Sequence, residues 1–295
     1  MKIFFILLSL ILIINTISTK EKKSVVVYGS STFSLMSNDI SNMLKSLGFN
    51  YKNNTAGGQI IETISAQQGS NPIKISFIDP SGIKFKESNK INISQFLSFG
   101  KLKPRGEFNV KLENGVEGII NLNKKIFIPT SPFYPYQIKN NSFIVDFGNQ
   151  KYTKKYIHIF NIGKNNLSSG YSAEQVFNAT KVLVNYLKLV SNDRYIIVGH
   201  FVNRDSTKEV KINILKCNEM LKNEYGNRYL DMQDYLMSPN IWKQLDINPN
   251  KKDLEYQTRG ELPVNLSKDK GHLNKKTQKL IVLKLKLKLI ELKLI

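Results

Sequence analysis

Near the N-terminus the pattern of apolar residues changes from strand-like to helix-like. Residues 25–28 form a short, fully apolar run, which is typical of a buried strand. Beyond Ser30 and Ser31, apolar side chains recur at helical spacing until Gly48, at Phe33, Met36, Ile40, Met43, Leu44 and Leu47. Ser30 and Ser31 are therefore predicted to lie in the turn between a strand and a helix.

The strand-then-helix order returns further along the chain. Strands are predicted in "KYIHIFNIG", "RYIIVGHF" and "RYLDM", and helices in "SAEQVFNATKVLVNYLKLV" and "KEVKINILKCNEMLKNEYG". Ser172 and Gln175 have the spacing of a capping box that opens the first of these helices, and Gly226 ends the second. This alternation predicts an α/β fold, a three-layer sandwich whose central parallel sheet is covered on both faces.

Between residues 72 and 150 the alternation of predicted strands and helices gives way to strand-like segments alone. The segments "IKISFI", "GEFNVKLENGVEGIINL", "KIFIPT" and "SFIVDFG" are β-type runs broken by Gly, Asn and Pro. Asn114 and Gly115 give a hairpin signal within the second run. We interpret 72–150 as a β-rich insertion in an α/β domain formed by 24–71 and 151–285; a spacer without a role of its own is the alternative.

The C-terminal segment "KKTQKLIVLKLKLKLIELKLI" carries two conflicting signals. Its Lys and Leu residues alternate with the period of a strand, whereas each residue type favours a helix. One interpretation is a helix that packs on the sheet through Leu280, Leu283 and Leu287, and the other is a low-complexity tail. Residues 286–295 are left unassigned.

Residues 1–20 read as a targeting segment. An early lysine, an apolar run and the small residues Thr16, Ser18 and Thr19 predict an export signal over 1–19 with cleavage after Ser18. An uncleaved membrane anchor is the alternative, although the run is shorter than the roughly 20 residues of a spanning helix. The expected location is secreted, periplasmic or at the cell envelope. The single cysteine, Cys217, excludes an internal disulfide and is predicted to be buried in a helix.

The chain is strongly basic, with a formal charge of +20 and a pI near 9.7. Its lysines are spread along the whole sequence, without an Arg-rich arm, zinc-finger spacing or an aromatic RNA-binding signature. Nucleic acid is therefore not the expected partner, and an acidic glycan or an anionic envelope surface suits the charge better.

The three histidines limit where a catalytic base can be. His158 is predicted to be a packed strand residue, and His200 ends a strand at the edge where α/β sheets bind ligands. His272 follows Asp269 by three residues, and at that spacing the two side chains can share one face of a turn. Asp269 can then accept the Nδ1 proton of His272, which leaves Nε2 free to face a serine. A solvated loop is the alternative explanation of this pair.

Ser31 has two interpretations. At the start of a helix, its hydroxyl and its backbone N–H both lie at the positive end of the helix dipole, where one residue can attack an ester and also hold the oxyanion. An ordinary N-cap serine is the alternative. A phosphate-binding loop is not indicated, because neither the P-loop nor the G-x-G-x-x-G motif is present.

Two further segments offer hydrogen-bond donors for an oxyanion. "NNTAGGQIIE" places Gly57 and Gly58 where a strand is expected to end, so that their backbone N–H groups can approach a substrate closely. "FNIGKNN" places Asn165 and Asn166 after the central strand, where a side-chain amide can also donate. Each segment is equally compatible with a plain turn.

Taken in order, "YGSST", "AGGQ", "GKNN" and "DKGHLN" resemble the four sequence blocks of the SGNH (GDSL-type) hydrolase superfamily. The resemblance implies that Ser31 is the nucleophile, His272 the base and Asp269 its orienting acid. It also implies an oxyanion hole formed by the Ser31 N–H, the Gly58 N–H and the Asn165 side chain, with Gly57 as the fallback for Gly58. The chain departs from the family pattern at Ser30 and Asn166, where the family has Asp.

With the segment "CNEMLKNEYGNRYLDMQDYL", the resemblance covers about residues 25–279. Over this length the chain is similar to the SGNH esterases of phage tail proteins that deacetylate bacterial surface polysaccharides, and to their bacterial relatives. It implies a serine esterase that removes acyl groups, most simply acetyl, from a carbohydrate, without a metal or organic cofactor. A lipase or thioesterase of the same fold is one alternative. A glycan-binding protein that has lost its chemistry, as the departures at Ser30 and Asn166 would permit, is another.

Overall fold

The fold is described from a computed structural model that covers residues 23–295 except 81–82, 96–103, 133–141, 150–151 and 191. The export signal predicted over 1–19, with its cleavage site after Ser18, lies outside the described residues.

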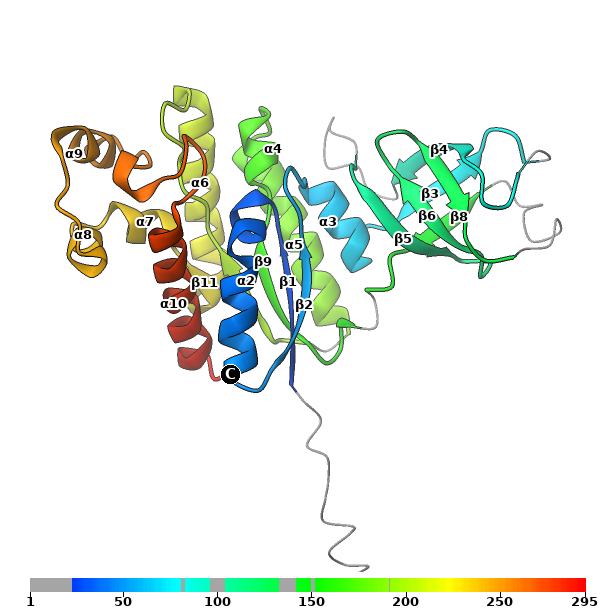
Figure 1. Cartoon of the computed structure of the whole chain (residues 1–295), viewed down its shortest axis with the longest axis horizontal. Coiled ribbons are helices and arrows are strands. Elements are labelled where there is room, and N and C mark those ends of the chain that lie inside the picture. The colour runs from blue at the N-terminus through cyan, green and yellow to red at the C-terminus, as the bar shows by residue number, and fades with distance from the viewer. Residues whose placement is uncertain (1–22, 81–82, 96–103, 133–141, 150–151, 191) are drawn as a thin grey trace, which may run out of the picture.

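A parallel β-sheet forms the centre of the larger part of the molecule (Figure 1). Within the described residues it has five strands in the order β11-β10-β9-β1-β2, and every neighbouring pair is parallel. The strands are β1 (Ser24–Gly29), β2 (Asn50–Thr55), β9 (Ile157–Asn161), β10 (Tyr195–Val198) and β11 (Tyr229–Leu230). The predicted α/β fold class is confirmed.

Helices cover both faces of this sheet, because successive residues of a strand point to opposite sides. Val25 and Val27 pack with helices α2 and α10, whereas Val26 and Tyr28 pack with α3, α5 and α6 (Figure 1). These helices are α2 (Ser31–Ser46), α10 (Lys275–Glu291), α3 (Ile61–Gln68), α5 (Ala173–Leu189) and α6 (Lys208–Tyr225). Ser172 opens α5 with the predicted capping box to Gln175, and Gly226 ends α6.

Several short helices complete the larger part of the molecule. Helix α4 (Lys164–Ser168) follows β9. Between β11 and α10 lie α7 (Met232–Met237), α8 (Asn240–Leu245) and α9 (Lys251–Thr258). Two 3-10 turns, at Gly226–Arg228 and Val264–Leu266, precede β11 and α10. Leu236, Ile241 and Leu245 join the core on the α2 and α10 side of the sheet.

The predicted β-rich insertion folds as a closed antiparallel barrel beside α3 (Figure 1). Its strands, in spatial order, are β3 (Ile73–Phe77), β4 (Asn89–Gln95), β7 (Ile126–Pro129), β6 (Glu117–Asn121), β5 (Glu107–Leu112) and β8 (Phe143–Asp146). The turn at Asn114 and Gly115 joins β5 to β6, and Gly115 has the positive φ of +91° that a hairpin turn favours. The barrel core includes Ala66 of α3, so the barrel and the α/β part share packed side chains.

The C-terminal segment is a helix, but the predicted packing residues are partly wrong. Leu283 and Leu287 are 49% and 51% exposed. The buried positions are instead Ile281, Val282, Leu285 and Leu289, and Leu280 is partly buried. Leucines two residues apart are rotated by about 200° on a helix, so the Lys and Leu alternation places leucines on opposite faces and does not mark the one that is buried.

The predicted burial of the single cysteine can be compared with the structure. Cys217 is buried inside α6, and burial raises the pKa of its thiol to about 12. Among the described helices, none combines the length and the hydropathy that crossing a bilayer requires. The segment "SPFYPYQ" also offers the aromatic residues Phe133, Tyr134 and Tyr136 as candidates either for stacking on sugar rings or for buried packing, and these three lie outside the described residues.

Candidate active site

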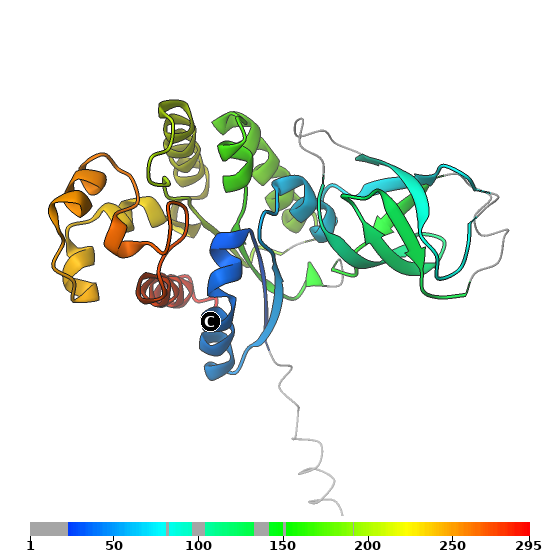
Figure 2. The ribbon, with the colours of Figure 1, turned by 45° about the horizontal axis from the view of Figure 1, so that its top comes forward.

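Ser31, His272 and Asp269 meet at the carboxyl edge of the sheet. His272 Nε2 lies 3.0 Å from Ser31 Oγ, although the two residues are 241 positions apart in the chain. His272 Nδ1 lies 2.9 Å from both carboxylate oxygens of Asp269. Figure 2 shows the loop before α10 beside the first turn of α2, which is how the two distant segments converge.

The turn after β1 distinguishes Ser31 from its neighbour. Ser30 is the N-cap residue of α2, is only 2% exposed and makes no side-chain capping bond. Ser31 is the first helical residue and is partly exposed, and its hydroxyl faces His272. The N-cap position therefore belongs to Ser30, and the hydroxyl of Ser31 is available to an incoming group.

The loop at 267–273 fixes the carboxylate against the imidazole. A β-bridge between Ser267 and Leu273 closes the loop, and the N–H groups of Gly271 and His272 donate to Asp269 Oδ1 at 2.8 and 2.9 Å. Partial desolvation raises the pKa of Asp269, but these hydrogen bonds and the contact with His272 outweigh it and lower the pKa below its usual value. The carboxylate is therefore ionised at neutral pH and suited to accept the Nδ1 proton of His272.

Three hydrogen-bond donors lie at the same edge of the sheet. Within the part of the chain that the structure describes, the N–H groups of Ser31 and Gly58 have no hydrogen-bond partner. Asn165 donates one amide hydrogen to the Gln59 carbonyl at 2.8 Å, which holds it beside the turn carrying Gly58 and leaves its second hydrogen free. Gly58 has a φ of +73°, a conformation that suits glycine. Gly57 lies next to it in the same turn.

Asn166 has a structural role that the sequence analysis missed. The side chain is fully buried, its Oδ1 accepts from the Ile61 N–H at 2.9 Å, and its amide donates to Glu62 at 2.8 Å. Tyr171 donates its hydroxyl proton to the other oxygen of Glu62 at 2.8 Å. Asn at this position therefore joins α4 to α3, whereas an Asp would oppose the buried carboxylate of Glu62.

Lys164 is a second residue whose importance no sequence motif indicated. It is 6% exposed, its ammonium lies 3.2 Å from the centroid of the Phe201 ring, and it donates to the Gly271 carbonyl at 3.4 Å. Burial lowers its pKa well below the usual value, an effect that the nearby Asp269 opposes. Gly163 before it has a φ of +100°, and a Cβ there would come within 2.3 Å of Val176. Lys164 thus connects the Asn165 segment to the loop that carries Asp269 and His272.

The two remaining histidines are buried and lie outside this cluster. The His158 ring packs against the rings of Tyr28 and Phe160, which also stack on each other, and burial lowers the pKa of His158 to about 4. His200 lies two residues beyond the end of β10 and is 1% exposed, and burial together with Lys164 lowers its pKa to about 3. Neither imidazole contacts Ser31, so His272 is the histidine placed to act on that hydroxyl.

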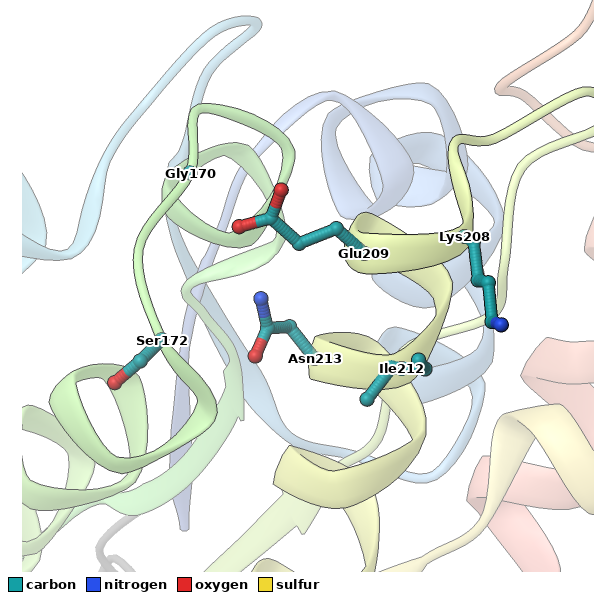
Figure 3. A pocket seen from close by; sticks show the side chains of 6 residues that line it. All are labelled: Gly170, Ser172, Lys208, Glu209, Ile212 and Asn213. Atoms are coloured by element: carbon teal, nitrogen blue, oxygen red, sulfur yellow. The ribbon is translucent and has the colours of Figure 1, made fainter.

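Cavity volume alone does not locate this site. A cavity of about 520 Å³ lies between the turn after α4 and the first turns of α6, lined by Gly170, Ser172, Lys208, Glu209, Ile212 and Asn213. Figure 3 shows Glu209 and Asn213 reaching toward the loop that carries Gly170, while Lys208 points away from it. Ser172 is occupied in capping α5, so this cavity offers no activated nucleophile. Among the described residues, no cluster of three or more His, Cys, Asp or Glu side chains is arranged to hold a metal ion.

Comparison with known proteins finds similarity among solved structures. No protein-family model matches the sequence, and no curated protein matches it. A solved structure with a similar fold is a member of the lipolytic protein G-D-S-L family from Veillonella parvula DSM 2008. It is 9% identical, the alignment covers 91% of this chain and 97% of that one, and the TM-score is 0.45.

Proposed function

We propose that the protein is a serine esterase that acts through a covalent acyl-enzyme. The observation that carries the proposal is the hydrogen-bonded series from Ser31 through His272 to Asp269, with contacts of 3.0 and 2.9 Å. A hydroxyl beside a neutral imidazole, itself held by an ionised carboxylate, is the arrangement that activates a serine for acyl transfer.

The reaction proceeds in two halves. Ser31 Oγ attacks the ester carbonyl carbon while His272 Nε2 accepts the hydroxyl proton. When the bond to the alcohol oxygen breaks, His272 donates that proton to the leaving alcohol, and the acyl group remains on Ser31. Water then attacks the acyl carbonyl with His272 accepting its proton, and His272 returns the proton to Ser31 as the carboxylic acid leaves.

The free donors would stabilise the negative charge that develops on the carbonyl oxygen. The N–H groups of Ser31 and Gly58 and the second amide hydrogen of Asn165 are the candidates for this oxyanion hole. The dipole of α2 adds to the effect, because its positive end lies at Ser31.

For the substrate, we propose an acyl group, most simply acetyl, on a carbohydrate outside the cell. The apolar leader supports export. The resemblance of the sequence blocks to those of carbohydrate acetylesterases supports the acetyl-sugar class, and the net charge of +20 suits an acidic polysaccharide.

Hydrolysis of 4-nitrophenyl esters of increasing acyl length tests the proposal. We expect kcat/KM to be highest for the acetate and the activity to be lost in Ser31→Ala. An optimum at long acyl chains would instead indicate a lipase, and hydrolysis confined to acyl thioesters would indicate a thioesterase. A folded protein that hydrolyses no ester but binds a glycan would be a binding protein on this scaffold.

A further inference from the structure

A groove of about 350 Å³ separates the barrel from the turn that carries the oxyanion donors. One wall is the segment 56–59 between β2 and α3, and the other is the segment 105–108 at the start of β5, with Asn123 at the β6–β7 turn. The lining residues are Ala56, Gly57, Gly58, Gln59, Arg105, Gly106, Glu107, Phe108 and Asn123.

Gly58 connects this groove to the reaction site. It lines the groove and also offers the free N–H that faces an ester carbonyl oxygen in the proposed mechanism. A Cβ at Gly57 or Gly58 would meet no atom within 4 Å, so the space beside the turn is open. A substrate held at Ser31 therefore has room to extend along the groove toward the barrel.

The barrel wall of the groove is fixed in place rather than free to adapt. The Arg105 N–H donates to Thr63 Oγ1 of α3 at 2.9 Å, and the Gly106 N–H donates to Asn123 Oδ1 at 2.7 Å. The Phe108 ring packs edge-to-face against Phe147 with centroids 5.3 Å apart. Since α3 begins directly after the segment that carries Gly58, these bonds tie the barrel wall to the oxyanion side of the site.

The groove combines an aromatic ring with charged and amide groups. Phe108 is partly exposed, and the exposed Arg105 and Glu107 precede it in the sequence. Glu107 accepts one hydrogen bond, from Asn121 at 2.9 Å, so its carboxylate retains free acceptor sites. A purely apolar acyl chain would desolvate both charged groups without compensation, which is unfavourable. A sugar ring matches the lining, because it has apolar C–H faces for the aromatic ring and hydroxyls for the guanidinium and the carboxylate.

We propose that this groove is a binding subsite for a sugar ring next to the acylated unit, with Phe108 as the stacking surface and Arg105 and Glu107 as hydrogen-bonding partners. The proposal rests on the esterase function and names the part of the chain that would distinguish a polymer from a small ester. It assigns the barrel a role in substrate selection.

The test compares polymer and small-ester hydrolysis in Phe108→Ala and Arg105→Ala. The substrates are acetylated xylan, which is neutral, acetylated pectin, which is acidic, and 4-nitrophenyl acetate. We expect the ratio of kcat/KM for polymer to kcat/KM for the small ester to fall by about tenfold in each variant. A preferential loss of pectin hydrolysis in Arg105→Ala would indicate that the bound sugar is acidic.

Phe85→Ala and Lys111→Ala are the matched controls, because Phe85 is an exposed ring and Lys111 an exposed cation of the insertion outside this groove. Both controls should retain the wild-type ratio. An unchanged ratio in Phe108→Ala and Arg105→Ala, or equal losses on all substrates, would overturn the subsite. So would a wild-type protein that cleaves 4-nitrophenyl acetate but neither polymer, an outcome that leaves the esterase proposal intact. Failure to cleave any ester would instead contradict the esterase proposal itself.

Discussion

At the scale of single residues, two adjacent asparagines have different environments and therefore different expected roles. Asn165 is partly exposed and keeps one amide hydrogen free, whereas Asn166 is fully buried and bonded to Ile61 and Glu62. The sequence indicated both as possible donors. Only the structure separates them, because the difference lies in what packs around each side chain.

Substitutions at these two positions should therefore act differently. Asn165→Ala should lower kcat for 4-nitrophenyl acetate by about 10²-fold or more, since Asn165 is a proposed oxyanion donor and the loss of one such donor has an effect of that order. Asn166→Asp should lower the free energy of unfolding by about 3 kcal/mol, because it places a second buried carboxylate against Glu62. Steady-state kinetics and denaturant unfolding of both variants check this. Equal effects on stability in the two variants would contradict the assignment.

Lys164 is expected to position the loop at Gly271 without taking part in the reaction itself. Replacing this buried ammonium by a methionine of similar volume, Lys164→Met, should leave the melting temperature unchanged or higher. The same change should lower kcat by about tenfold, because the loop at Gly271 loses its partner. Thermal unfolding and single-turnover kinetics measure the two effects. A variant with full activity would show that Lys164 does not position the loop.

The difference in unfolding free energy between the wild type and Lys164→Met should depend on pH. The folded-state pKa of Lys164 is depressed below its ordinary value of 10.5, so the unfolded chain binds more protons between the two values. The wild type should therefore gain stability relative to Lys164→Met as pH rises through that window toward 10.5. A difference in unfolding free energy that does not change with pH would contradict the depressed pKa.

At the scale of elements, central strand β9 carries a buried histidine that limits acid stability. His158 has a folded pKa of about 4, against 6.5 for an exposed histidine. Between these values the unfolded state binds more protons, so stability is lost as pH falls from 6.5 toward 4, by on the order of 3 kcal/mol. In His158→Phe, which keeps an aromatic ring against Tyr28 and Phe160, this decline should be smaller. Urea unfolding at several pH values measures it, and parallel curves for the two proteins would contradict the account.

Sequence patterns predicted some elements well and others poorly, for physical reasons. The strand at 25–28 and the helix after it were predictable because their periods are distinct and each buries one clear face. The buried side of α10 was not, since alternating leucines lie on opposite sides of a helix. Helix α3 was not predicted from the sequence, for a different reason. Its sequence "IETISAQQ" is largely polar, yet every residue is buried, because α3 lies between α5 and the barrel.

At the scale of the whole molecule, the site depends on long-range convergence that no local pattern contains. The four sequence blocks indicated which residues to examine, and the parallel sheet explains why strand ends meet at one edge. The 3.0 Å contact between segments 241 residues apart, and the groove formed by the barrel, follow only from the tertiary fold.

The net charge of +20 also acts at this scale. If the substrate is a polyanion, hydrolysis of acetylated pectin should fall as ionic strength rises from about 0.02 to about 0.5 M, because salt screens long-range attraction. Hydrolysis of neutral 4-nitrophenyl acetate should change little over the same range. Equal salt responses of the two substrates would count against an acidic polysaccharide.

The central claim is that Ser31 is an activated nucleophile, and covalent labelling by a fluorophosphonate probe tests it most directly. The probe should add to the wild-type protein on the peptide that contains Ser31, as read by mass spectrometry. Ser30→Ala is the matched control, since the neighbouring hydroxyl is buried and does not face His272. Labelling that persists in Ser30→Ala and disappears in Ser31→Ala is the predicted result. An unlabelled wild type, or labelling that survives Ser31→Ala, would contradict it.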